Sequence, residues 1–316
     1  MPELPEVESV RSGLARYLIG RAIEAVEILD PRSLRRQAGG PGAFARQLAG
    51  RTVTAAVRRG KFLWLPLDDG RALSAHLGMS GQLLVRGAVA EPHDDVEGAR
   101  IAGRVDAHRA GPMATRAPTL VHEPSIRPRH LRVRLHLAPI DGDASDGAFV
   151  DLVDQRVFGG LHVTDLVPTS DGEPGGRGSP DALLPDDARH IARDLLDPAL
   201  DRRDAAARMR SSGRAIKTIL LDQRIVSGVG NIYATEALFA SGIHPARAAD
   251  SLSRADCSRL ADAIKSVLRA AIEQGGTTLR DFSQPDGTSG YFAVKLAVYG
   301  KSGEPCPRCG TTLAQE

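Results

Sequence analysis

The first eight residues, MPELPEVE, contain the arrangement in this chain with the clearest chemical potential. If Met1 is removed, as a small second residue generally permits, Pro2 becomes the N-terminus and carries a secondary amine. An α-amino group has a pKa of about 8, against about 10.4 for lysine, so a useful share is neutral near neutral pH. Such an amine could attack a sugar C1′, with Glu3 shuttling protons. A structural interpretation also stays open, because prolines and acidic residues favour a helix N-terminus.

Two glycine-rich segments could approach a nucleic acid. In residues 228–231, GVGN, the glycines would let backbone approach a phosphate at a helix N-terminus, with Asn231 as the cap. In residues 76–81, HLGMSG, an exposed Met79 could wedge between bases. Each signal is weak alone, since a glycine-rich connection is usually a turn and a methionine usually lies in a core.

The cysteines indicate half of a zinc site. Cys306 and Cys309 have metal-ligand spacing, and two thiolates supply half of the four ligands that a structural site requires. Cys257 falls in a helical stretch and is predicted to pack there as a small apolar residue. Three cysteines are too few for a disulfide framework.

These residues need elements that position them, and the first half of the chain predicts an antiparallel β domain after one helix at 6–19. Strands are expected at 51–58, 61–67, 71–77, 81–86, 131–137, 147–153 and 160–165. In 131–137, LRVRLHL, strict alternation predicts an apolar face and a basic, solvated face. Residues 87–127 have no sustained period and predict a long surface loop.

The second half of the chain predicts helices. Pro and Gly are frequent in 168–185, which indicates an interdomain linker. Helices are expected at 186–196, 203–209, 214–222, 231–241 and 251–274, followed by a hairpin at 290–313.

Composition excludes several classes of protein. With 316 residues, 42% hydrophobic and 25% charged, the chain is globular rather than disordered or fibrous. No apolar run approaches the ~18 residues of a membrane helix, and the N-terminus is acidic where a secretory signal would be basic, so a cytoplasmic protein is expected. The net charge of +2 does not by itself indicate a nucleic-acid partner. Basic residues cluster, however, with eight arginines against two acids between Arg100 and His136.

Taken together, the motifs resemble those of the bacterial formamidopyrimidine-DNA glycosylases, which excise oxidised purines such as 8-oxoguanine and nick the abasic strand. They are MPELPEVE at 1–8, RRGKFLWL at 58–65, HLGMSG at 76–81, HLRVRL at 130–135, DQRVFGG at 154–160, AIKTILLDQ at 215–223, SGVGNIYATEALFASGIHP at 227–245, GGTTLRDF at 275–282, and GYFA with VYGKSGEPCPRCG at 290–310. The order and number of these matches exclude chance.

The resemblance implies a role for each matching residue. Pro2 would form a Schiff base at C1′, Glu3 would act as the acid on the sugar ring, and Glu6 would support the N-terminal geometry. Lys61 would lie beside the abasic-site phosphate and donate the proton for β-elimination. The residues implied to contact DNA are Met79, Arg156 and Phe158, which would fill the gap left by an extruded nucleotide, and His130, Lys217 and Asn231, which would hold phosphates. The loop from 281 to 291 would close over the extruded base.

The resemblance also implies the architecture. It is an α+β fold, with an N-terminal antiparallel β-sandwich flanked by helices (1–167, insertion at about 87–127) and a linker (168–185). A helix–two-turn–helix domain (186–289) and a partial zinc-finger hairpin (290–316) follow. The partner would be double-stranded DNA containing oxidised bases, bound by a monomer in the bacterial cytoplasm, at the nucleoid.

One departure concerns the cofactor. Members of the family normally carry a second cysteine pair about 16 to 20 residues beyond the first, with a phosphate-gripping arginine between the two pairs, and this sequence ends at Glu316. We therefore expect weak zinc binding through Cys306 and Cys309, with impaired DNA affinity or δ-elimination. Two alternatives stay open: an endonuclease VIII-like enzyme for oxidised pyrimidines, against which Leu4 and residues 154–160 and 275–282 argue, and a catalytically impaired DNA-binding remnant.

Overall fold

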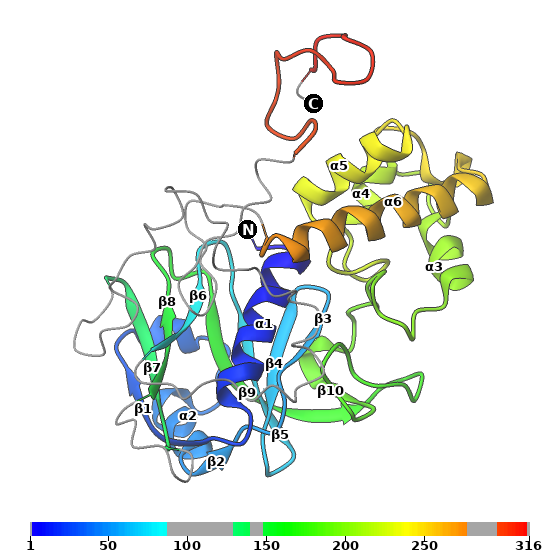
Figure 1. Ribbon diagram of the computed structural model, residues 1–316. Helices are drawn as coiled ribbons and strands as arrows, with labels where there is room; N and C mark the ends of the chain where they lie inside the picture. The colour runs from blue at the N-terminus through cyan, green and yellow to red at the C-terminus, as the bar shows by residue number, and fades with distance from the viewer. Residues whose placement is uncertain (1, 87–128, 140–147, 277–295, 315–316) are drawn as a thin grey trace, which may run out of the picture.

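The computed structural model describes residues 2–86, 129–139, 148–276 and 296–314. Figure 1 shows two parts, a set of strands with α1 against it and a separate group of helices. The α-helices are α1 (Leu4–Leu18), α2 (Gly40–Leu48), α3 (Arg202–Met209), α4 (Ile216–Leu221), α5 (Asn231–Ser241) and α6 (Arg254–Glu273). Short 3-10 helices are η1 (Pro31–Leu34), η4 (Asp186–Ala188) and η5 (Ala249–Ser251).

The strands form two antiparallel sheets. One has the order β2-β1-β7-β8-β6 and the other β10-β9-β5-β4-β3. Their bounds are β1 Ala22–Ile28, β2 Arg51–Thr52, β3 Val57–Arg59, β4 Phe62–Pro66, β5 Arg71–His76, β6 Gln82–Arg86, β7 Leu131–Leu137, β8 Ala148–Val153, β9 Gly160–Pro168 and β10 Leu183–Pro185. Leu135 of the first sheet and Leu63 and Leu73 of the second belong to one buried cluster, so the predicted β-sandwich is confirmed.

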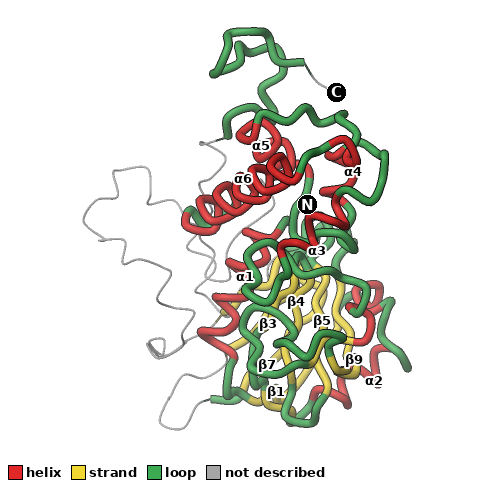
Figure 2. Tube along the Cα trace, turned by 90° about the vertical axis from the view of Figure 1, so that its right-hand side faces the viewer, coloured by secondary structure: helices red, strands yellow, loops and turns green. Residues whose placement is uncertain are grey.

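Helix α1 connects the two parts. Its residues Val7, Val10 and Leu14 are buried in the sandwich core, whereas Leu4 at its first turn belongs to the core of the helical part. Figure 2 shows that the helical part lies at one end of the strands, so the start of α1 lies where the two parts meet. A single helix thereby fixes the chain's N-terminus at the junction.

The helical part encloses its own core. Tyr233 of α5 and Leu260 and Ile264 of α6 are fully buried there. Helix α6 begins with a reciprocal cap, because the Ser253 side chain accepts from the Asp256 backbone while the Asp256 side chain accepts from the Ser253 backbone. This cap explains why the helix begins at Arg254 instead of the predicted position 251.

The predicted helix at 186–196 is wrong. Only η4 is helical there, and the backbone of Ala192 donates to the Gln223 carbonyl instead of to its own segment. Arg193 and Asp194 make ion pairs with Asp171 and Arg58 of other segments, which an amphipathic pattern does not reveal. The sequence interpretation also missed β1 and α2.

The segment predicted as a linker, 168–185, lies against the second sheet. It ends in β10, which pairs with β9, and Arg177 exchanges two backbone hydrogen bonds with Arg58. A Cβ on Gly176 would lie 2.4 Å from the Arg58 carbonyl oxygen, so glycine permits this close approach. Gly176 therefore allows this segment to pack against the edge of the sheet.

The basic, solvated face predicted for β7 is wrong at one position. Arg134 is 4% exposed and donates two hydrogen bonds to the Asp151 carboxylate, at 2.7 and 2.8 Å. The neighbouring strand therefore neutralises the charge that the alternation assigned to solvent.

The predicted loops at 87–127 and 281–291, and the start of the hairpin at 290–295, lie outside the described residues. None of the helices in the described ranges has the length and apolar character of a membrane span.

Candidate active site at the junction of the two parts

The Glu3 carboxylate lies at the N-terminus of α5. It accepts hydrogen bonds from the backbone of Gly230 (2.7 Å) and Ile232 (3.0 Å), with Tyr233 N at 3.5 Å. Helix N-termini favour such a negative charge. Burial is nevertheless the larger influence, and it raises the pKa of Glu3 to about 7 against the pull of Lys61 and the backbone donors. Glu3 is thus able to give or take a proton near neutral pH.

The prediction that Asn231 caps α5 is wrong. The N-cap is Gly230, and Asn231 is the first helical residue and is exposed. Glu3, more than two hundred positions away in sequence, supplies the acceptor that a local cap would have supplied. A Cβ on Gly230 would lie 2.3 Å from the Glu3 carboxyl carbon, so the glycine makes room for the carboxylate.

Glu6 holds the turn that carries Pro2 and Glu3. One of its oxygens accepts from the Glu3 backbone at 2.8 Å, and the other accepts from the Tyr233 hydroxyl at 2.7 Å. Glu6 and Tyr233 are both buried, and so is Pro2. The N-terminal turn is therefore fastened to α5 through the Tyr233 hydroxyl as well as through Glu3.

Lys61 faces this acidic pair from the turn between β3 and β4. Burial lowers the pKa of its amine, and the charges of Glu3 and Glu6 partly oppose that shift. The structure thus brings Pro2, Glu3, Glu6 and Lys61 to the start of α1. Three reactive groups therefore lie together: Pro2, which becomes the terminal amine once Met1 is removed, the Glu3 carboxyl with a pKa of about 7, and the buried Lys61 amine with a lowered pKa.

A second group of predicted residues lies on two adjoining loops of the sandwich. Met79 and Phe158 are 45% and 49% exposed, which is unusual for large apolar side chains. Asp154 is fully buried and accepts from the Ser80 hydroxyl (2.6 Å) and from the Arg156 and Gly159 backbone. One carboxylate therefore orders both loops and leaves their apolar tips exposed.

Arg35 supports the second of these loops. Its guanidinium donates to the carbonyl oxygens of Val157, at 2.7 Å, and Phe158. Val157 has φ +57, a conformation that a β-branched residue rarely adopts. The two hydrogen bonds from Arg35 therefore help to hold the loop in an unfavourable backbone conformation.

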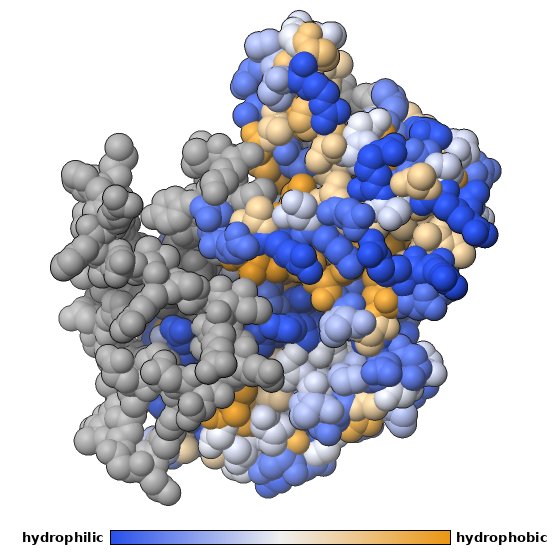
Figure 3. All heavy atoms as spheres, turned by 45° about the vertical axis from the view of Figure 1, so that its right-hand side comes forward, coloured by the Kyte–Doolittle hydropathy of each residue, from blue (hydrophilic) through white to orange (hydrophobic). Residues whose placement is uncertain are grey.

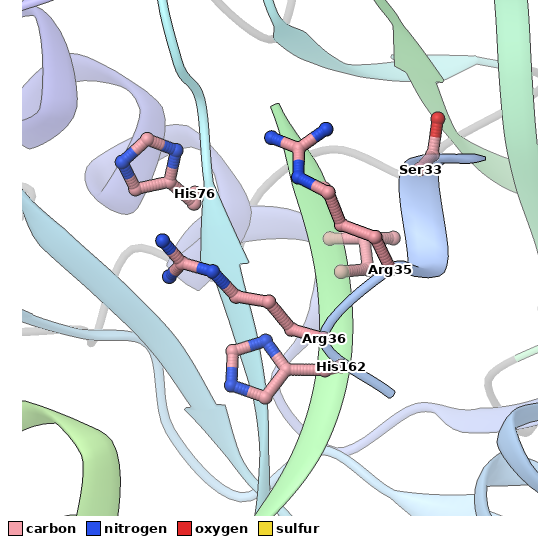
Figure 4. Close-up of a pocket in the computed structure, with 7 residues that line it drawn as sticks. Ser33, Arg35, Arg36, His76 and His162 are labelled. Atoms are coloured by element: carbon pink, nitrogen blue, oxygen red, sulfur yellow. The ribbon is translucent and has the colours of Figure 1, made fainter. Parts of the chain in front are cut away.

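A small pocket lies next to this loop. Figure 4 shows Arg35 and Arg36 beside His76 and His162 in its lining. Burial and the two arginines lower the pKa of His76, whose Nδ1 accepts from the Gly78 backbone. The pocket is therefore basic without depending on a charged His76.

The remaining predicted contacts lie apart from the carboxylates. His130 is half-buried, and its carbonyl accepts from the Asp154 backbone, so it adjoins the two loops. Lys217 lies in the first turn of α4, on the helical part, and is half-buried. Figure 3 shows hydrophilic side chains gathered along the boundary between the two parts on the face in view. The predicted DNA contacts thus come from both sides of that boundary.

Two family models together match most of the chain. The model of the formamidopyrimidine-DNA glycosylase N-terminal domain matches residues 1–161, and that of the formamidopyrimidine-DNA glycosylase H2TH domain matches residues 191–283. The chain belongs to the formamidopyrimidine-DNA glycosylase family. It is 42% identical to the family member of Leifsonia xyli subsp. xyli, over 100% of this chain and 95% of that protein. Identity to the Thermobifida fusca member is 43%, over 100% and 93%.

Solved structures of the family share the fold. The complex of a Lactococcus lactis glycosylase mutant with Fapy-dG-containing DNA has a TM-score of 0.71 and 27% identity, over 100% of this chain and 94% of that one. The complex of the L. lactis enzyme with abasic-site DNA has a TM-score of 0.69 and 25% identity, over the same shares. The predicted α+β architecture with a helix–two-turn–helix domain is confirmed.

The zinc ion typical of this family does not fit the described residues. Cys306 and Cys309 lie on one turn, closed by bonds from Cys306 N to Thr311 O and from Gly310 N to Cys306 O. No group of three potential ligands occurs within the described ranges. Two thiols are half of a tetrahedral set. Arg308, between them, instead docks the turn on α5 by donating to the Phe239 carbonyl and stacking on its ring.

Sequence reasoning missed several residues that hold this glycosylase site together. Tyr233 and Asp154 lie within family motifs, yet nothing in their spacing assigns them partners, and Arg35 lies outside every motif. Arg58 and Asp194 form a buried ion pair at 2.7 Å between the two parts of the molecule. Nothing in the sequence signals this pair, since an arginine that follows an apolar strand position is expected on the solvent face, and only the structure shows that both charges are buried.

Proposed function

We propose that the chain excises oxidised purines, namely 8-oxoguanine and formamidopyrimidines, from double-stranded DNA and then cleaves the strand at the abasic site. The observation that carries this proposal is the meeting of Pro2, Glu3 and Lys61 at the start of α1, where burial raises the pKa of Glu3 to about 7. The relatives named for this activity and the L. lactis complexes with Fapy-dG DNA support the substrate class.

The reaction uses Pro2 as the nucleophile once Met1 is removed. Its neutral amine attacks C1′, the N–C1′ bond forms as the base leaves with the glycosidic electron pair, and the proton that the amine loses neutralises the departing base. Protonated Glu3 gives its proton to the ring oxygen as the C1′–O4′ bond breaks, which leaves an iminium. That group acidifies the C2′ hydrogen, whose proton passes to the Glu3 carboxylate as the electron pair expels the 3′ phosphate by β-elimination, and Lys61 assists this step beside the phosphate. Water then releases Pro2.

The exposed loops recognise the DNA. Met79 and Phe158 enter the gap left by the extruded nucleotide, and Arg156 pairs with the orphaned base. His130, Lys217 and Asn231 hold phosphates. The enzyme acts as a monomer on the chromosome, in the bacterial cytoplasm.

Borohydride reduction with a duplex carrying 8-oxoguanine opposite cytosine tests the proposal. A covalent protein–DNA adduct supports it, and peptide mass analysis must place the adduct on Pro2. An adduct formed only with thymine glycol would instead identify an endonuclease VIII-like enzyme. Binding without any adduct would identify an inactive DNA-binding protein.

A second measurement separates chemistry from binding. Glu3→Gln should retain affinity for lesion-containing DNA and lose base release, because the amide cannot donate a proton to the ring oxygen. The mass of the purified protein should show that Met1 is absent. Full activity in material that keeps Met1 would contradict the assigned nucleophile.

A further inference from the structure

The turn that carries Lys61 is held from the other part of the molecule. Asp194, in the segment after η4, places Oδ2 2.7 Å from Arg58 Nη1 and 3.1 Å from Gly60 N. Arg58 also donates to the Gly60 carbonyl at 3.1 Å. One carboxylate oxygen therefore binds both Arg58 and Gly60, the residues that lie just before Lys61 in the chain.

The lysine turn packs closely against residues 227 and 228. Gly60 has φ +58, and a Cβ there would lie 2.4 Å from the Ser227 hydroxyl and 2.9 Å from Gly228 N. Ser227 in turn forms a parallel bridge with Asp194, and the Gly228 carbonyl accepts from Leu4 N at 3.0 Å. The same short segment thus contacts both the lysine turn and the start of α1.

The charges at this contact are buried. Asp194 and Arg58 are each 2% exposed. Arg58 also donates from Nε to Glu8 at 2.7 Å, so it joins Glu8 of α1 to Asp194 of the helical part. Removing one member of such a group leaves a buried charge with incomplete compensation, so the geometry depends on each partner.

We propose that Asp194 is a positioning residue for Lys61, holding the 58–60 turn from the helical part so that the lysine faces the sugar. This inference rests on the role proposed above for Lys61. Asp194 lies outside every motif on which that role depends, and it does not touch the reacting atoms.

The test compares Asp194→Asn with Asp197→Asn. Asp197 is a matched control: it lies in the same segment, its side chain is 8% exposed, and it binds Arg193 and the Ala199 backbone instead of the lysine turn. Single-turnover cleavage of preformed abasic DNA should slow about 10- to 100-fold in Asp194→Asn, as expected for a small misplacement of a reacting group. It should stay near the wild-type rate in Asp197→Asn at temperatures where both are folded.

A double-mutant cycle measures whether Asp194 acts on the cleavage rate through Lys61, which a purely structural role for Asp194 would not require. In a Lys61→Ala background, Asp194→Asn should change the cleavage rate less than about twofold, because the lysine through which it acts is gone. Additive losses would overturn the proposal. So would equal losses in Asp194→Asn and Asp197→Asn.

A second variant guards against misfolding of the first. Gly60→Ala displaces the same turn while leaving Asp194 intact, and it should slow cleavage in the wild-type background but not in the Lys61→Ala background. A cleavage rate that Gly60→Ala leaves unchanged in the wild-type background would contradict the inference. Absence of a borohydride adduct in the wild type would instead overturn the proposed function, so the two failures are distinguishable.

Discussion

Glu3→Gln should stabilise the protein at alkaline pH and destabilise it at acidic pH. Glu3 is 3% exposed, and burial raises the pKa of its carboxyl from 4.5 to about 7. The folded state therefore binds the proton more tightly than the unfolded state, and stability falls as the pH rises from 4.5 to about 7. At about 1.4 kcal/mol per pKa unit, the ionised carboxyl costs the folded state about 3 kcal/mol above that range.

Glutamine does not ionise, so the variant lacks this cost. However, the amide nitrogen of glutamine cannot accept the hydrogen bond that one carboxylate oxygen of Glu3 accepts from the backbone at the start of α5. The loss of this hydrogen bond reduces the gain in stability by about 1 kcal/mol. The free energy of unfolding should thus rise by about 2 kcal/mol near pH ~8.5 and fall by about 1 kcal/mol near pH ~4.5. Urea unfolding at both pH values measures the change as a shift in midpoint at constant slope.

Glu8→Gln is the control of opposite sign. Arg58 and Arg11 lower the pKa of Glu8 despite its burial, so its contribution to stability is present above the unfolded pKa and lost as the pH falls. That variant should lose more stability at the alkaline pH than at the acidic one. Equal losses of stability in Glu3→Gln at both pH values would contradict the raised pKa of the Glu3 carboxyl.

Three further outcomes are expected. Gly230→Ala should reduce single-turnover base release by at least tenfold while sparing DNA affinity, because its Cβ would lie 2.3 Å from the Glu3 carboxyl carbon; unchanged release would contradict the close packing. Arg35→Ala should slow excision of 8-oxoguanine more than cleavage of preformed abasic DNA, since the 154–159 loop loses two hydrogen bonds. Arg32→Ala, whose partner is Asp30, is its control and should affect neither rate. Lys217→Ala should weaken binding to lesion and normal duplexes equally and reduce the slope of log K against log salt by about one; a loss confined to lesion DNA would argue against a phosphate contact.

Local sequence patterns determined most of the elements. Alternation specified β7 at its observed bounds, and the 3.6-residue period specified α5 and the greater part of α6. The N-terminal residues and Met79 were candidates from residue type and short glycine-bounded turns, whereas Phe158 was indicated only by the resemblance to the family; both Met79 and Phe158 are exposed. These features are encoded within a few residues of one another.

Only the tertiary structure decided how those residues work together. Glu3 accepts hydrogen bonds at the start of α5, more than two hundred positions away in the sequence. The pKa of its carboxyl is raised by burial between the two parts, which no local pattern specifies. The segment at 186–196 is helical only in η4, and its partners are distant in sequence: the Ala192 backbone donates to the Gln223 carbonyl, and Arg193 and Asp194 form long-range ion pairs. Desolvation and buried charge pairing depend on which segments meet in space, so a linear sequence identifies the reactive groups without revealing their surroundings.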